Sequence, residues 1–354
     1  MHPEQLQDYA ATGKPVMNAN FSGQRWRQVA IAGLTFIECD FSNMTLDECQ
    51  WQRCVFIRCQ FAKTQFNKLR WNQSNLLQST AEDTQWHGEC HGATFAESDL
   101  SGASFDSLSL EATTFSDCKF DKISATNCSF KTTALNQLSF EGAQFDSCMF
   151  SNVAWLKANL TKTTLSQCQL NQVLLLEADL SGLDLSAMPL QNCTCSESKL
   201  VGTKLAGAQL QGSNFSKCKI EKADFTGAQL QRALFIEATI KQSQFGKAVM
   251  QACNFQQAQI DEVDFTECML KEGWFKQASL KQCKLNGCDL SYVNFAHASL
   301  NECQLKGVTL NRTNIHQMTL NNSDWPNTSG DAVLDTDPDL SQIEEKLSQL
   351  GVVL

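Results

Sequence analysis

The residues of this sequence that could carry out chemistry do not fall into a catalytic arrangement. No Ser/His/Asp set, His-Glu-x-x-His motif, nucleophile elbow or phosphate-binding glycine loop can be built from it. The histidines are scattered along the chain: they are His2, His87, His91, His297 and His316. We therefore expect that the protein is not an enzyme and that it has no catalytic residue and no cofactor.

One short segment has the residue types of a metal site. His87, Cys90 and His91 offer two imidazoles and a thiol, which are ligands that zinc prefers. No fourth ligand is evident, and histidines in an irregular turn are usually just solvated. We expect no metal, although the sequence alone leaves zinc binding by these three residues open.

Cysteine is the other residue type with reactive potential, and there are 17 of them. Fifteen share one position of a five-residue period with Ala, Ser, Thr and Val. These are Cys39, Cys49, Cys54, Cys59, Cys118, Cys128, Cys148, Cys168, Cys193, Cys218, Cys253, Cys268, Cys283, Cys288 and Cys303. A reduced cysteine is a small, polarizable apolar residue, so we interpret them as core filler rather than a disulfide framework. Reduced cysteines and no classical signal peptide predict a cytoplasmic protein, with non-classical secretion left open.

A period of five residues organises the chain. From Phe95 to Trp325, 45 of 47 positions at this spacing hold Phe, Leu, Ile, Met or Trp, with Ala125 and Cys195 as exceptions. Two residues after each of these positions, no Phe, Leu, Ile, Val, Met or Trp occurs. An earlier block, from Phe21 onward, obeys the same rule in a register that is offset by one missing residue within residues 87–93.

This period fits neither a helix nor a flat strand, but it fits a chain that turns a corner every five residues. Four such units close a square coil of 20 residues, and stacked coils bury their large residues inside. The sequence predicts about 15 coils, which at ~4.8 Å per coil would extend ~70 Å.

The units that carry the clearest motif are residues 178–182, Ala-Asp-Leu-Ser-Gly, and residues 223–227, Ala-Asp-Phe-Thr-Gly. Over residues 19–327 the chain resembles the pentapeptide repeat proteins, whose consensus is Ala-(Asp/Asn)-Leu-x-x. The resemblance implies an all-β fold, a right-handed quadrilateral β-helix solenoid with short helical elements at the ends. It also implies that the acidic residues just before a core position are ordinary outward residues rather than catalytic acids: Asp179, Asp184, Asp224, Asp264 and Asp289.

Four segments follow from these patterns. We expect an N-terminal cap over residues 1–18, helical over residues 4–11, a first repeat block over 19–92, a second over 93–327, and an acidic linker with an amphipathic helix over 328–354. Asp337 and Pro338 read as the start of that helix. Its apolar face consists of Leu340, Ile343, Leu347 and Leu350. The helix is either a cap over the last coil or a dimerisation or docking helix.

Outward positions suggest the function. The residue after each core position should face solvent, yet on one face it is repeatedly apolar. This stripe consists of Ile37, Ile57, Leu77, Leu156, Leu176 and Ile236, with the neighbours Leu174, Leu234 and Trp274. An apolar stripe among polar residues is a candidate interface, and tryptophan is a typical anchor. We predict a protein-binding scaffold, and a homodimer through this face or the C-terminal helix is also open. The alternative to a binding surface is that these apolar residues are scattered on the surface without a function, or that the terminal tail covers this face.

The resemblance suggests a second function. Some pentapeptide repeat proteins mimic DNA and protect DNA gyrase from quinolones or toxins. Of the net charge of -10, the repeat body carries only -4, whereas ~70 Å of duplex DNA carries roughly 40 charges. We therefore rank DNA mimicry below scaffolding, and expect no direct nucleic-acid binding and no transmembrane segment. Residues 10–16 are similar to the lead-in of bacterial effectors encoded beside type VI secretion systems, so an effector role is also open.

Overall fold

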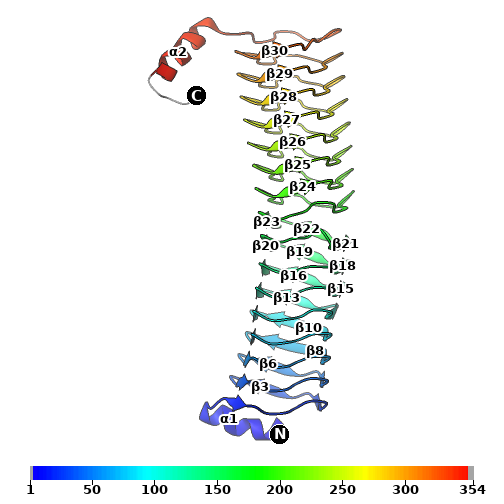
Figure 1. Ribbon diagram of the computed structural model, residues 1–354, viewed down its shortest axis with the longest axis vertical. Coiled ribbons are helices and arrows are strands. Elements are labelled where there is room, and N and C mark those ends of the chain that lie inside the picture. Colours follow the sequence, from blue (N-terminus) through cyan, green and yellow to red (C-terminus); the bar gives the residue numbers. More distant parts are fainter. Residues whose placement is uncertain (1–2, 350–354) are drawn as a thin grey trace. The chain divides into compact units, whose positions relative to one another are not determined.

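The computed structural model describes residues 3–349, whose backbone winds into a β-solenoid of about 15 turns with a short helix near each terminus (Figure 1). This confirms the solenoid predicted from the five-residue period. The chain divides into two compact units, Met1–Asp184 and Leu185–Leu354. Within each unit, residues 20 apart in sequence pair as parallel neighbours on successive coils, except across one register shift.

One flat face of the first unit is a nine-stranded parallel sheet. Its strands, in spatial order, are β1 (Val16–Met17), β4 (Thr35–Ile37), β7 (Val55–Ile57), β9 (Asn75–Leu77), β11 (Thr94–Ala96), β14 (Thr114–Ser116), β17 (Ala134–Asn136), β20 (Ala154–Leu156) and β23 (Leu174–Leu176). The order of the strands is the order of the chain because each coil adds one strand. Every core residue on this face therefore stacks directly on its equivalent in the next coil.

Two further faces of the first unit join into one 14-stranded sheet. One series of its strands contains β2 (Arg25–Arg27), β5 (Thr45–Asp47), β12 (Ser104–Asp106), β15 (Ser124–Thr126), β18 (Gln144–Asp146) and β21 (Thr164–Ser166). The other contains β3 (Ala30–Ala32), β6 (Gln50–Gln52), β13 (Ser109–Glu111), β16 (Ser129–Lys131), β19 (Met149–Ser151) and β22 (Gln169–Asn171). The two long strands β8 (Gln65–Asn72) and β10 (Gln85–His91) pair with both series and so connect the faces.

The second unit has one continuous face of strands, a seven-stranded sheet. Its members are β24 (Lys199–Val201), β25 (Lys219–Glu221), β26 (Thr239–Lys241), β27 (Gln259–Asp261), β28 (Ser279–Lys281), β29 (Ser299–Asn301) and β30 (Thr319–Asn321). On its other faces, single bridges join successive coils, as Asn254 does with Trp274. Tight turns connect the repeats within each coil. In these turns a backbone N–H bonds the carbonyl three residues earlier, as Ala258 does to Phe255 at 3.0 Å.

The large apolar position of the repeat is the core. These side chains are buried from Phe21 to Leu310, and aromatic rings stack on their equivalents one coil away. Phe41 and Phe61, for example, have centroids 4.7 Å apart and nearly parallel planes. The small position is also inside, because the 15 cysteines that occupy it are all buried. Burial raises the pKa of Cys118 to about 11 and that of Cys253 to about 12, so these thiols stay protonated.

The corners of the coils explain why one position of the repeat excludes large apolar residues. With the exception of Lys162, the residue two places after a core residue has a positive φ, for instance Glu38 at φ 55° and Gln137 at φ 54°. Only glycine adopts this conformation freely, and β-branched residues adopt it poorly. A corner side chain also points away from the core, so polar residues and glycine occupy it.

The missing residue of the repeat lies where β8 meets β10. Trp86 pairs with Phe66, but Gly88 pairs with Leu69, so His87 alone faces two residues of β8. A bulge of this kind accommodates the one-residue difference in length between β8 and β10 without disturbing the coils on either side. Gly88 is required there, because it has φ +135° and a Cβ would lie 2.2 Å from the Leu69 carbonyl oxygen.

Short helices lie at both ends of the described chain. A single 3-10 turn, η1 (Pro3–Gln5), leads into α1 (Leu6–Thr12), and the solenoid begins at once with Val16 paired to Phe36. At the other end the backbone ladder continues past residue 327 to the bridge between Asn314 and Leu334. This pairing needs only backbone groups, so the apolar pattern does not reveal it. Then α2 (Pro338–Gln349) begins at the proline that the sequence indicates.

Candidate protein-binding face

The nine-stranded sheet brings the first five residues of the predicted stripe, Ile37 to Leu176, onto one row. Ile37 pairs with Ile57, and Ile57 pairs with Leu77 on the next coil. Further along the same row Leu156 pairs with Leu176. Leu174 lies on β23, two residues before Leu176, and therefore points to the same side of the sheet.

These side chains are half-buried, because neighbours above and below in the row cover part of each one. Met17 is the exception: it is 55% exposed and begins the row, paired with Ile37. The stripe predicted from the sequence does not include Met17. A signal for it exists, since Met17 follows Val16, which lies 20 residues before the core residue Phe36.

Polar residues divide the row into two parts. Ser116 and Asn136 stand between Ala96 and Leu156 on successive strands. We call the first part, together with Val55 at the start of β7, the proximal cluster; its members are Met17, Ile37, Val55, Ile57 and Leu77. We call the second part, together with the adjacent row of Ala134, Ala154 and Leu174, the distal cluster; its members are Ala134, Ala154, Leu156, Leu174 and Leu176.

In the second unit the stripe residues are not continuous. Leu234 and Trp274 lie on one row of bridges, but asparagines separate them, in the order Asn214, Leu234, Asn254, Trp274, Asn294, Asn314 and Leu334. Ile236 is half-buried two residues after Leu234. Trp274 is 49% exposed and so is an isolated apolar side chain rather than part of a patch.

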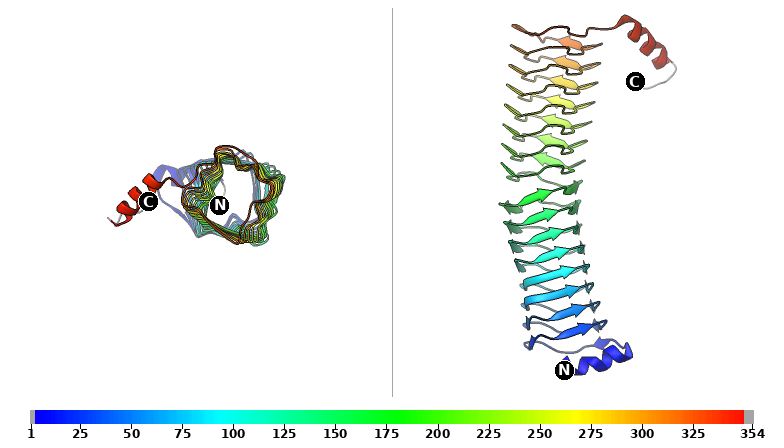
Figure 2. Two further views of the ribbon diagram at one scale, coloured as in Figure 1. Left: turned by 90° about the horizontal axis from the view of Figure 1, so that it is seen from above. Right: turned by 180° about the vertical axis from the view of Figure 1, so that it is seen from behind.

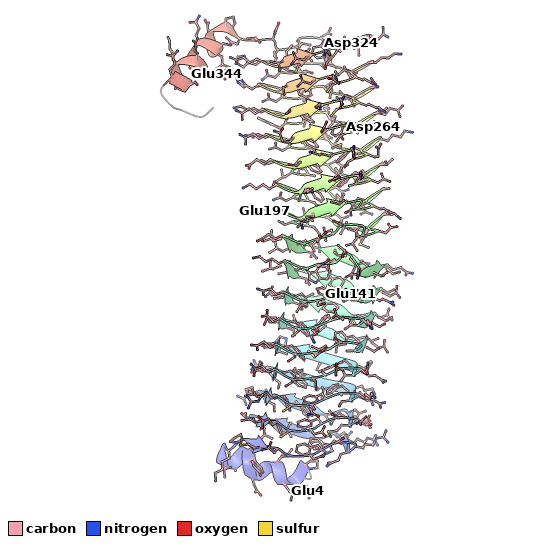
Figure 3. The ribbon with its side chains drawn as sticks, viewed as in Figure 1. Glu4, Glu141, Glu197, Asp264, Asp324 and Glu344 are labelled. Atoms are coloured by element: carbon pink, nitrogen blue, oxygen red, sulfur yellow. The ribbon has the colours of Figure 1, made fainter. Side chains whose placement is uncertain are left out.

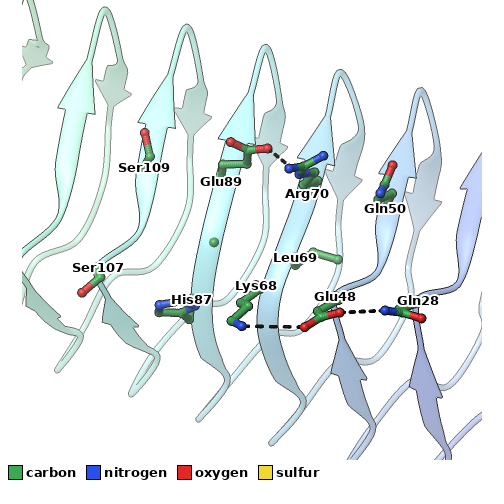
Figure 4. A pocket seen from close by; sticks show the side chains of 11 residues that line it. Gln28, Glu48, Gln50, Lys68, Leu69, Arg70, His87, Glu89, Ser107 and Ser109 are labelled. Carbon is green, nitrogen blue, oxygen red and sulfur yellow. Dashed lines mark hydrogen bonds and ion pairs between the residues drawn. The ribbon is translucent and has the colours of Figure 1, made fainter.

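The 14-stranded sheet presents a charged surface instead. Arg70 Nε lies 3.0 Å from Glu89 Oε1, and Lys131 Nζ lies 2.7 Å from Glu111 Oε1, each pair joining successive coils. Beside the β8–β10 bulge is an open depression of about 680 Å³, shown in Figure 4. Its charged groups already pair with each other, as Glu48 does with Lys68 at 3.7 Å. We find no reactive set among them.

The three residues that could bind zinc are not brought together. Cys90 is 2% exposed inside the coil, where burial raises the pKa of its thiol. His91 lies outside, with Nδ1 3.7 Å from Glu111 Oε2. His87 is exposed in the depression at the bulge. Strand alternation explains this separation, because adjacent residues of β10 point to opposite sides.

The acidic residues before core positions have a structural role. Asp179, Asp224, Asp264 and Asp289 each accept a hydrogen bond from the backbone N–H two residues later, at 2.8–3.1 Å. Such a bond stabilises the turn at the start of a repeat. Figure 3 shows Asp264 at the outer edge of its coil. Asp184 also has a partner, so none of the five is a free carboxylate aimed at a site.

Two of the three described residues on the apolar face of the C-terminal helix are exposed to solvent. Asp337 caps it by accepting hydrogen bonds from the N–H groups of Asp339 and Leu340 at 2.9 and 3.1 Å. Leu340 is 42% exposed and Ile343 is 54% exposed. Leu347 is half-buried, and Leu350 lies outside the described residues. Viewed along the coils, α2 lies outside their outline (Figure 2).

A cluster that the sequence prediction missed links α2 to the coils. Glu344 Oε1 lies 3.1 Å from His297 Nε2, and Glu344 Oε2 lies 3.0 Å from His316 Nε2. The spacing of 19 residues between the two histidines is a signal for stacking on successive coils, and His297 N–H indeed bonds the His316 carbonyl. Nothing in the repeat pattern places Glu344, because it lies beyond the repeats.

Among the described residues, this is the only group of three potential metal ligands whose donor atoms lie within 4.8 Å of one another. The donor types suit zinc, but the hydrogen bonds do not. His316 Nδ1 accepts the N–H of Asp337 at 3.1 Å, so the proton of this imidazole lies on Nε2. A metal on Nε2 would need the opposite tautomer and would break that bond. The cluster therefore fits hydrogen bonding better than a metal.

Hydropathy gives no sign of a membrane span: across residues 3–349, no helix combines the length and apolarity that crossing a bilayer requires.

Comparison with solved structures finds repeat proteins of known fold. A pentapeptide repeat protein from the Arabidopsis thaliana thylakoid lumen is 25% identical over 26% of this chain and 64% of its own, with a TM-score of 0.26. This chain thus spans less than two thirds of that protein. QnrB1, a plasmid-mediated fluoroquinolone resistance protein, is 15% identical over 57% of this chain and 98% of its own, with a TM-score of 0.28.

HetL, a pentapeptide repeat protein involved in heterocyst differentiation regulation in the cyanobacterium Nostoc, is 18% identical over 69% of this chain and 87% of its own, with a TM-score of 0.20. A mannuronan epimerase module from Azotobacter vinelandii is 8% identical over 95% of this chain and 94% of its own, with a TM-score of 0.31. With scores this low, none of these likenesses bears on function. No curated protein matches the sequence significantly.

Two family models do match. The pentapeptide repeat region matches residues 175–245 and 258–334. The eight-copy pentapeptide repeat matches residues 36–68, 157–187 and 228–266. Together they cover more than half of the chain, and their period is the one that the coils show. The chain therefore belongs to the pentapeptide repeat family.

Proposed function

We propose that this protein is a non-enzymatic scaffold that binds a partner protein on the outward face of the nine-stranded sheet. Pentapeptide repeat proteins are generally non-catalytic, which supports the first part of the proposal. The observation that carries the second part is the proximal cluster, an unbroken row of apolar side chains from Met17 to Leu77. The same coils are polar and charged on the 14-stranded sheet, so the repeat itself does not require the row.

The geometry of the row fits an amphipathic helix of the partner. Side chains in the row repeat at ~4.8 Å, the spacing of stacked strands. Residues three and four apart on a helix repeat at about 5–6 Å along its surface. The two spacings stay matched over about three helical turns, close to the length of the proximal cluster. Docking an apolar helix face onto an apolar surface is a common form of peptide recognition.

Ion pairing between coils argues against the DNA-mimic alternative. Arg58 Nη2 lies 2.9 Å from Glu38 Oε1, and Lys119 Nζ lies 2.9 Å from Asp99 Oδ2. A surface on which acids are matched by bases does not resemble a phosphate backbone. Inhibition of DNA gyrase supercoiling and quinolone protection by the purified protein would revive this alternative. A bacterial effector role remains compatible with scaffolding and needs export to be measured.

The scaffold proposal is tested with a matched pair of variants. Ile57→Asp with Leu77→Asp places two charges in the proximal cluster. Gln52→Asp with Asn72→Asp places two charges on the same two coils of the 14-stranded sheet, where these residues also pair. A partner captured by the wild type and identified is then purified, and its affinity is measured by calorimetry.

We expect the first variant to weaken binding at least about tenfold, since each charge would be desolvated against apolar side chains. The second variant should bind like the wild type. Circular dichroism should be unchanged in both. Equal binding by all three proteins would show that the partner does not use this face.

A further inference from the structure

The first and last coils of the solenoid differ in how completely their core residues are covered. At the N-terminal end Leu6 of α1 is only 1% exposed, and the first core residues are buried. At the C-terminal end Ile315, Leu320 and Trp325 occupy core positions but are only half-buried. Phe295 and Leu300, one coil earlier, are at most 1% exposed. Within residues 3–349, part of the apolar interior of the last coil and the edge strand β30 therefore have no cover.

An apolar segment that could cover this end stands beside it. Helix α2 follows Leu334, which is already paired with Asn314 in the last coil. Its 12 residues give it a length of about 18 Å, enough to cross a coil. Leu340 and Ile343 nevertheless remain among the most exposed apolar side chains in the described part of the chain.

Polar contacts hold α2 in this position. The Glu344 carboxylate accepts hydrogen bonds from His297 Nε2, His316 Nε2 and Gln317 Nε2, the last at 3.2 Å. Its side chain is 14% exposed although it belongs to a surface helix. Burial disfavours its ionised form, but the bonds from the two histidines outweigh this, and the pKa of Glu344 is lowered. We call this set of three bonds the Glu344 latch.

We propose that α2 is a lid held open by the Glu344 latch. When the latch breaks, the helix turns about residues 335–337 and lays Leu340 and Ile343 over Leu320 and Trp325. Closure removes apolar surface of both α2 and the last coil from water. This burial drives the movement once the hydrogen bonds to Glu344 no longer oppose it. The latch thus decides whether the last coil is open to contact.

Trp325 reports closure. Five of the seven tryptophans are at most 3% exposed, so a quencher in solution reaches only Trp274 and Trp325. In a Trp274→Phe background, acrylamide quenching of fluorescence therefore measures the exposure of Trp325. Glu344→Ala breaks the latch. Glu345→Ala is the matched control, because it removes a carboxylate from the same helix at an exposed position.

We expect Glu344→Ala to lower the quenching constant roughly two-fold, as a half-exposed ring becomes covered by apolar side chains. Glu345→Ala should leave the constant unchanged. Adding Ile343→Asp to Glu344→Ala should restore quenching, since a charged residue cannot pack over the last coil. This pattern would establish both the latch and the lid.

Three results would overturn the proposal. Unchanged or increased quenching in Glu344→Ala would mean that the helix is only a tether. Persistent protection after Ile343→Asp would mean that something else covers Trp325. A change in the wild type on adding EDTA or one equivalent of Zn²⁺ would mean that a metal joins His297, His316 and Glu344 in place of direct hydrogen bonds.

Discussion

The nine-stranded and 14-stranded sheets of the first unit share one core, but the outer surface of the former carries an apolar row and that of the latter is polar and charged. Phe56 on the former and Trp51 on the latter are both fully buried and lie against each other, with ring centroids 5.0 Å apart. The neighbour that follows Phe56 is Ile57, in an apolar row, whereas the neighbour that follows Trp51 is Gln52. Inward residues thus set the fold on every face, while outward residues are free to differ.

This comparison separates stability from recognition. A solenoid gains its stability from stacking of neighbouring repeats, and that stacking uses the inward positions. The outward positions contribute little to it, so a row such as the proximal cluster is best explained by contact with something outside the coil. Substitutions at inward and outward positions should therefore differ in their effect on stability.

The largest effect should come from adjacent residues of one strand. Phe56→Ala should lower the free energy of unfolding by about 3–5 kcal/mol, because it opens a cavity among packed aromatic rings. Ile57→Ser, on the outside of the same strand β7, should lower it by less than about 1 kcal/mol. Urea denaturation measures both. Similar losses for the two variants would contradict the division between inward and outward positions.

A second comparison concerns two glycines of the polar face. Gly88→Ala should cost about 2–4 kcal/mol, since φ +135° strains an alanine and its Cβ would collide with the backbone of Leu69. Gly92→Ala should cost only about 1–2 kcal/mol, the penalty of an ordinary left-handed residue. At Gly92 the nearest atom is 3.4 Å away, and Ala112 adopts a similar φ of 51°. Thermal unfolding of the two variants would show no difference if the bulge were unimportant.

The smallest effect should come from the ion pairs of the charged face. A hydrogen bond from Lys131 and the charge of that lysine lower the pKa of Glu111. The pair therefore adds stability above the ordinary pKa of a glutamate, and loses it as the pH falls through the lowered value. Glu111→Gln should unfold slightly more easily than wild type at pH 7, and the difference should disappear once the pH lies well below the lowered pKa of Glu111. High salt should also remove the difference, and its persistence there would point to packing instead.

Much of this structure could be read from the sequence because a period of five is a strong and repeated signal. It identified the solenoid, the buried cysteine positions and the register shift near residue 87. It could not place α2, whose Glu344 contacts His297 and His316 by reaching back from outside the repeat. The stripe was predicted as one surface, although the 20-residue spacing already places Ser116 and Asn136 between Ala96 and Leu156 and so divides it into two clusters.

The five-residue pattern alone specifies which residues lie inside each coil, since burying a large side chain every five residues is the condition for the coil to form. The same period predicts that outward residues 20 apart become neighbours. How the two registers join is visible only in the folded chain, where the bulge at Gly88 changes that spacing once. The same holds for the end of the solenoid. Whether α2 covers the last coil or stands beside it depends on the balance between an apolar face and three hydrogen bonds to Glu344, and no periodic pattern expresses that balance.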